Sequence, residues 1–159
     1  MADLPYRVDV RTMETLSAHD LYALLKMRVD VFVVEQQCAY PELDGKDLDA
    51  VHVRLMEGDM PVAAARILPP GKASATVKIG RVVVSPDHRG KRLGEALMRE
   101  AIAVCERQFP EIQIGLSAQR HLQHFYESFG FQPVSAVYLE DGIAHVDMLR
   151  PVSGAKDGL

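Results

Sequence analysis

The stretch "SPDHRGKRLGEAL", residues 85–97, follows directly on the apolar run "IGRVVV" and begins a long helical pattern. A structural turn between a strand and a helix needs one or two glycines and an N-cap residue, but this turn also carries Arg89, Lys91 and Arg92. The first N–H groups of a helix lack intrahelical partners, and the helix dipole adds partial positive charge there. The stretch therefore favours an anion site at the start of a helix. A solvated surface turn is the alternative.

The nucleotide fingerprints that also use glycine-rich turns do not fit this stretch. The chain contains no "GxxxxGK[ST]", and "RGKRLG" lacks the glycine spacing and the later acidic residue of a dinucleotide site. Gly90 and Gly94 would allow the backbone to approach a bulky phosphate. We therefore expect a phosphate-bearing ligand of another kind.

Patterns on either side of this stretch predict alternating strands and helices. Apolar alternation and turn residues predict strands over 6–12, 51–68 (two strands around "EGDMP"), 77–84 and 112–118. Helical spacing predicts helices over 17–36, 90–108 and 120–130, and the final 131–151 predicts a hairpin that turns at Asp141-Gly142. This order predicts an α+β fold: a central mixed, mostly antiparallel sheet of about seven strands with helices on both faces.

Length and composition limit the class of protein. With 159 residues, 48% of them hydrophobic, we expect one domain over 1–159, with 152–159 as a flexible tail. The formal net charge of −4 argues against nucleic-acid binding. Because the N-terminus shows no signal pattern and the apolar runs are short, we expect a cytoplasmic protein without membrane contact. Cys38 and Cys105 predict neither a disulfide framework nor a metal site.

Together, "RVVVSP", "HRGKRLG" and "FYESFGF" resemble the Gcn5-related N-acetyltransferase (GNAT) superfamily, over roughly residues 6–150. Its R/Q-x-x-G-x-G/A motif matches Arg89 and Gly94, whereas Arg92 occupies the central glycine position, a change that a helical backbone would tolerate. Four longer blocks resemble the ElaA branch of that superfamily: "RVDVFVVEQQCAYPELDGKDLDAVH", "IGRVVVS", "AQRHLQHFYESFGF" and "YLEDGIAHVDM".

The resemblance implies direct transfer of an acetyl group from acetyl-coenzyme A to a primary amine, without a metal. It implies that the N–H of Val82 polarises the thioester carbonyl and that Tyr126 protonates the leaving sulfur. A packed aromatic is the alternative for Tyr126, and a buried strand for residues 82–84. The positions that match the superfamily's cofactor contacts are Val82, Val83, Val84, Arg89, Gly90, Lys91, Arg92, Leu93, Gly94 and Gln119.

The general base is less well defined, because Lys78 stands where relatives can carry a glutamate. Deprotonation of the amine can run through water, Glu35, His52 or His145, and we prefer His145. Arg28 and Glu35 fall on one apolar helical stripe, and this pattern predicts one of two arrangements. Either the two residues form a structural ion pair, or they form an acceptor-binding site together with His52. In the second case an acidic lip beside it would favour a cationic amine; its residues are Glu42, Asp44, Asp47 and Asp49.

Two other functions remain open. Arg28, Phe32, the acidic loop and "ARILPP" also resemble acyl-homoserine-lactone synthases, although those are usually longer and carry a tryptophan that this chain lacks. A domain that only binds acetyl-coenzyme A would keep the same loop. The acceptor can be a small molecule or an amine of a peptide or protein, and an exposed strand edge can support a homodimer.

Overall fold

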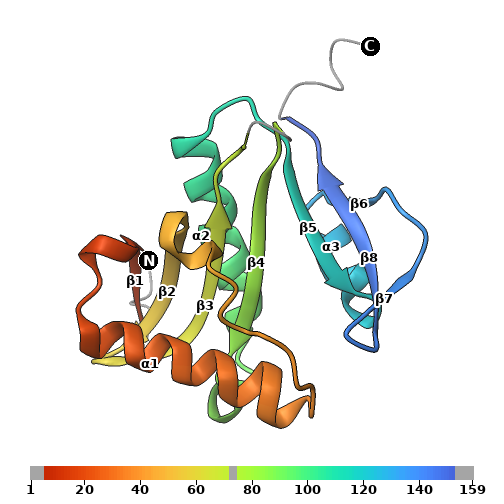
Figure 1. The fold of residues 1–159 in the computed structure, drawn as a ribbon. Helices are drawn as coiled ribbons and strands as arrows, with labels where there is room; N and C mark the ends of the chain where they lie inside the picture. Colours follow the sequence, from red (N-terminus) through yellow and green to blue (C-terminus); the bar gives the residue numbers. More distant parts are fainter. Residues whose placement is uncertain (1–5, 72–74, 153–159) are drawn as a thin grey trace.

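A sheet of eight strands runs through the computed structural model, which describes residues 6–71 and 75–152 (Figure 1). The strands are β1 (Arg7–Thr12), β2 (Val51–Glu57), β3 (Met60–Leu68), β4 (Val77–Val84), β5 (Ile114–Gln119), β6 (Gln132–Pro133), β7 (Tyr138–Glu140) and β8 (Ile143–Arg150). Their order is β1-β2-β3-β4-β5-β8-β6, and β7 also pairs with β8. Among the described strands only β4 and β5 pair in parallel. The mixed, mostly antiparallel sheet is confirmed, with eight strands because β6 and β7 are separate.

Helices cover both faces of this sheet, as predicted. Helix α1 (Ala18–Val29) lies on one face, where Leu24 and Met27 belong to a buried cluster with Ala64 of β3 and Val83 of β4. Helix α2 (Leu93–Gln108) lies on the opposite face and supplies the larger core, together with the short α3 (Gln123–Glu127) (Figure 1). Burial of these apolar side chains drives the two layers onto the sheet.

The first helix is shorter than the predicted span of 17–36. Ser17 caps it by accepting a hydrogen bond from the N–H of Asp20 at 3.0 Å. The α-helical turns end at Val29, and the chain continues as a π-helix, η2 (Asp30–Glu35). The run "VDVFVV" is rich in β-branched residues, which are weaker helix formers than leucine or alanine. The wider π turn leads directly into the loop that forms one wall of the site.

Strands β4 and β5 separate soon after they meet. Their ladder is limited to Val77 with Ile114 and Lys78 with Gly115, whereas β5 continues to pair with β8 along its whole length. The register between β3 and β4 also shifts by one residue between Ala64 and Arg66, which places an irregularity near Arg81 and Val82. Figure 1 shows β4 and β5 diverging along their length.

Two predictions concern the chain ends and membranes. Residues 153–159 of the predicted flexible tail, and residues 1–5, lie outside the described part of the chain. Within the described part, no helix combines the length and the apolar character that a membrane span requires.

Candidate functional site

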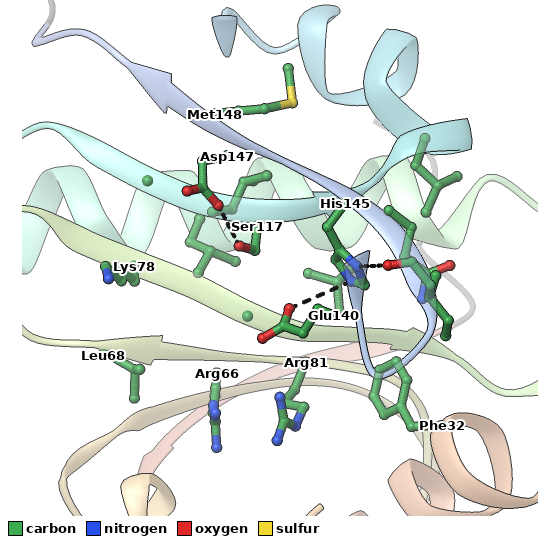
Figure 2. A pocket seen from close by; sticks show the side chains of 18 of the residues that line it. Phe32, Arg66, Leu68, Lys78, Arg81, Ser117, Glu140, His145, Asp147 and Met148 are labelled. Atoms are coloured by element: carbon green, nitrogen blue, oxygen red, sulfur yellow. Dashed lines mark hydrogen bonds and ion pairs between the residues drawn. The ribbon is translucent and has the colours of Figure 1, made fainter. Parts of the chain in front are cut away.

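A cavity of about 610 Å³ occupies the place where β4 and β5 diverge. It is lined by β4 through Lys78, Gly80 and Val82, and by β5 through Ser117 and Gln119. Two further walls come from the 36–46 segment after η2 and from the hairpin of β7 and β8 (Figure 2). The separation of the strands therefore leaves a cavity with Val82 of β4 on one side and residues of β8 on the other.

The sequence-predicted acid, Tyr126, lines this cavity from α3. Its side chain is held between Phe125 and Phe131, with ring centroids 5.1 and 6.3 Å away in edge-to-face arrangements. Burial raises the pKa of Tyr126 to about 12 because the phenolate would lose its hydration. The phenol therefore keeps its proton at neutral pH and can give it only to a strong base formed beside it.

The preferred base, His145, lines the same cavity from β8. Its Nδ1 lies 2.7 Å from the carbonyl oxygen of Ile143, and because a carbonyl only accepts, Nδ1 carries the hydrogen. In the neutral ring this leaves the lone pair on Nε2. The carboxylate of Glu140 lies 3.8 Å from Nε2, where it would stabilise the imidazolium formed by proton uptake (Figure 2).

The residues at the start of α2 form a second, smaller cavity, with Val84, Arg89, Gly90 and Gly94 in its lining. Gly90 has φ of +80°, a left-handed backbone that favours glycine, and nothing lies within 4 Å of the position where a Cβ would stand. Cations, an open glycine and a helix N-terminus thus meet here, as the sequence predicted. Of the predicted contacts, Arg92 and Leu93 also line this cavity, Lys91 is not among its lining residues, and the side chain of Val83 is buried under α1.

The helical backbone expected at Arg92 is not found. Arg92 precedes the first turn of α2 with φ of 59° and ψ of 26°, a left-handed conformation, and the helix begins at Leu93 rather than near Gly90. Glycine adopts this conformation without the steric cost that Arg92 bears. The glycine that the family motif has at this position is thereby explained by the backbone.

The acidic lip predicted over residues 42–49 is not a free anionic surface. Glu42 and Asp47 are 3% and 5% exposed, and three arginines pair with Glu42, Asp44 and Asp47, whereas Asp49 is exposed. Arg28 donates to Glu42 at 2.6 Å and to both oxygens of Asp47 at 2.8 and 3.0 Å. The remaining ion pairs join Arg66 to Asp44 and Asp47, and Arg81 to Glu42 and Asp44. Three of the four carboxylates that were expected to attract a cationic acceptor are therefore already paired.

The three predicted acceptor-binding residues lie outside the large cavity. Arg28 is 1% exposed in the ion network just described, so the expected pair between Arg28 and Glu35 is wrong. Glu35 instead accepts two hydrogen bonds from Arg89, at 2.6 and 2.9 Å. His52 is 1% exposed, its Nε2 lies 3.0 Å from the carbonyl oxygen of Asp47, and burial lowers its pKa. A ring in that position has no path to an acceptor in the cavity.

Sequence reasoning missed a polar cluster at the cavity: Ser117 and Asp147 line it, and Tyr138 contacts both of them. A signal for it was present, because Asp147 lies two residues beyond His145 on the same face of a predicted strand. The cross-strand partner could not be found in this way. Ser117 of β5 faces Asp147 only because β5 and β8 pair in that register.

Comparisons with known proteins identify the family and the fold of the chain. The family described as "Acetyltransferase (GNAT) domain" matches residues 24–150. The Escherichia coli protein ElaA is 48% identical over 139 residues, which cover 86% of this chain and 91% of that protein. The crystal structure of an acyl-CoA N-acyltransferase from Pseudomonas aeruginosa superposes with a TM-score of 0.88 at 42% identity, covering 91% of this chain and 99% of that one.

A more distant structure bears on the alternative function. The CoA-dependent acyl-homoserine-lactone synthase BjaI superposes with a TM-score of 0.77 over 91% of this chain and 82% of its own. At 20% identity this likeness shows a shared fold alone.

Proposed function

The chain belongs to the GNAT acetyltransferase family, in its ElaA-like branch, and from this premise we propose that it transfers an acetyl group from acetyl-coenzyme A directly to a primary amine. Members of this family use an acyl-coenzyme A as co-substrate. The acetyl group, the amine and the direct route are the parts that we propose. The acceptor is a small molecule or an amine of a peptide.

The observation that carries this proposal is the open wedge between β4 and β5. Arg81 and Val82 stand opposite Ala65 where the β3–β4 register shifts, and Arg81 has φ of 50°. β4 has no ladder partner on its β5 side beyond Lys78. Backbone donors near Val82 thus face a cavity instead of a neighbouring strand, and donors fixed before the reaction are the kind that stabilise a developing oxyanion.

The second cavity supports the same donor. The helix N-terminus and the exposed Arg92 suit the diphosphate of coenzyme A, and the open space at Gly90 allows close approach of a phosphate. Arg89 would have to exchange its pair with Glu35 to join them. Val84 lines this cavity and Val82 lines the large one, so β4 connects the two. An extended thioester can therefore be anchored at α2 and react in the wedge.

In the proposed reaction the neutral amine attacks the thioester carbonyl, so that a C–N bond forms and the C–S bond breaks. Nε2 of His145 takes one proton from the nitrogen, and Tyr126 gives its proton to the departing thiolate. A general acid or base is typically worth about 10² to 10⁴ in rate. Water can then return the proton from His145 to Tyr126.

A panel of primary amines tests the proposal, with free thiol release from acetyl-coenzyme A as the signal. We expect turnover with at least one amine, and we expect Tyr126→Phe to lower kcat by about 10² or more. The affinity for coenzyme A, measured by calorimetry, should change little, because the phenol acts only on the leaving group. Equal losses in kcat and in affinity would contradict the acid role, and binding without turnover would favour a domain that only binds the thioester.

The same assay separates the synthase-like alternative. With S-adenosylmethionine as the acceptor, a homoserine-lactone synthase would release an acylated lactone that mass spectrometry detects. We expect no such product. Its appearance would overturn the proposed acceptor class but not the acyl transfer.

A further inference from the structure

Three side-chain oxygen atoms from β5, β7 and β8 meet beside the cavity, which Ser117 and Asp147 line. Oγ of Ser117 and the hydroxyl of Tyr138 lie 2.7 and 2.6 Å from the same oxygen of Asp147, Oδ1, and 2.6 Å from each other. These three contacts share only two hydroxyl hydrogens, so at any moment at least one oxygen pair has no hydrogen between its atoms. The cluster therefore has one hydrogen fewer than its contacts could use, and an additional donor would stabilise it.

The second carboxylate oxygen of Asp147, Oδ2, has no hydrogen-bond partner among the described residues, and Asp147 lines the cavity (Figure 2). The backbone of Asp147 is fixed, because its N–H donates to Ser135 at 2.9 Å and its carbonyl accepts from Val134 at 2.8 Å. Burial alone would raise the pKa of Asp147. The hydrogen bonds from Tyr138 and Ser117, with the charges of Lys78 and His145, hold that pKa below its ordinary value instead.

The charges around this cavity make Asp147 distinctive. Glu42, Asp44 and Asp47 are each paired with buried arginines, as described above. Glu140 faces His145, and Asp141 lies in the β7–β8 turn at the rim. Asp147 is thus the carboxylate of the described cavity wall that is both held ionised by fixed hydroxyl donors and left with one oxygen open to a ligand.

We propose that the Ser117–Tyr138–Asp147 cluster anchors the acceptor's ammonium group, and that the acceptor therefore arrives as a protonated aliphatic amine. An N–H of the ammonium donates to Oδ2 of Asp147. His145 lies two residues along β8 on the same face, and its ring stacks on Tyr138 with centroids 6.1 Å apart. The anchor thus presents the nitrogen beside the lone pair of Nε2, which takes the first proton before attack and releases it to water. The second proton leaves the nitrogen during attack and passes to the regenerated Nε2, as in the proposed reaction. Asp147 is a recognition residue, and His145 remains the base.

This inference rests on the proposed function for the reaction that follows, but binding tests it without turnover. The probes are n-butylamine, which is cationic at pH 7, and 1-butanol, a neutral chain of similar size. Amide signals of residues 117 and 147 are followed by NMR in the full chain as each probe is added. We expect n-butylammonium to bind about 10- to 100-fold more tightly than the alcohol, the range that a charged hydrogen bond supports.

The matched variants are Asp147→Asn and Asp141→Asn. Both remove one negative charge from the cavity, and asparagine tolerates the left-handed backbone of residue 141, where φ is 51°. We expect Asp147→Asn to abolish the preference for the ammonium and Asp141→Asn to retain it within about threefold.

Three outcomes would overturn the anchor: equal binding of the amine and the alcohol, an unchanged preference in Asp147→Asn, or an equal loss in both aspartate variants. Failure of the anchor is distinct from failure of the acetyltransferase. If thiol release occurs but Asp147→Asn leaves the KM for the amine unchanged, the proposed ammonium anchor is wrong and the acetyltransferase proposal is unaffected. If no amine is acetylated but the ammonium preference is lost in Asp147→Asn, the ammonium anchor is supported and the proposed reaction is wrong.

Discussion

Arg92 shows how a single residue can add positive charge to an anion site and yet strain its own backbone. Its φ of 59° lies in the left-handed region, and its guanidinium, 89% exposed, has Glu95 as an ion-pair partner only at 3.8 Å. The conformation is imposed by the tight entry into α2. The side chain contributes no packing that offsets its cost.

We therefore expect Arg92→Gly to raise the free energy of unfolding of the ligand-free protein by up to about 1 kcal/mol. Arg92→Ala is the matched control, because it removes the same charge but keeps a Cβ. Urea unfolding of both variants measures the difference. If alanine stabilises as much as glycine does, the effect comes from charge, and the backbone argument is wrong.

At the scale of elements, a buried ion network ties α1 to the loop that walls the site. Arg28 of α1 contacts Glu42 and Asp47, and Arg66 and Arg81 connect the same loop to β3 and β4. Arg81 also sits over the ring of Tyr40, 5.5 Å from its centroid. Because Arg81 lies beside Val82, the network joins the loop to the irregularity in β4.

Arg28→Met should lower the free energy of unfolding by about 3 kcal/mol or more, because it leaves buried carboxylates without one of their partners. Lys26→Met on the same helix is the control: Lys26 pairs with Asp30 at 2.6 Å, but its side chain is 63% exposed, so we expect little change. Thermal and urea unfolding measure both variants. Similar effects of the two substitutions would show that the network does not hold the loop.

At the scale of the whole molecule, the carboxylates paired with arginine determine the response to acid. The hydrogen bonds from Arg66 are the main reason that the pKa of Asp44 lies well below its ordinary value. Burial alone would raise the pKa values of Asp9 and Asp47, but hydrogen bonds and charges from arginines hold both below the ordinary value. In the unfolded chain these groups return to about 3.9.

The sign of the pH dependence follows from these directions. Above about pH 5 both states are ionised, and the folded state keeps the full stabilisation. As the pH falls below that value the unfolded state binds protons first, so the free energy of unfolding decreases until the folded carboxylates are protonated as well. Urea unfolding at several values between pH 7 and pH 2 measures this loss. In Asp44→Asn the decrease should be smaller, and an identical slope would contradict the role of Asp44.

Local patterns in the sequence determined much of this protein. The alternation in β1 to β4, the cap at Ser17 and the Asp141-Gly142 turn each depend on residues close together in the chain, and each is found in the structure. The cationic helix entry and the face of β8 that carries His145 were predicted for the same reason. The period of a strand or helix is a property of neighbouring residues, so such features can be inferred without the fold.

Only the tertiary structure decided which charges are neutralised and which side chains share a cavity. Glu42, Asp44 and Asp47 looked like an exposed lip until the fold brought Arg28, Arg66 and Arg81 against them from three separate elements. Ser117, Tyr138 and Asp147 likewise meet only through the strand register. Coulomb energies and hydrogen bonds depend on distances across the sheet, which sequence spacing does not specify, because strand order and register are set by packing of the whole core.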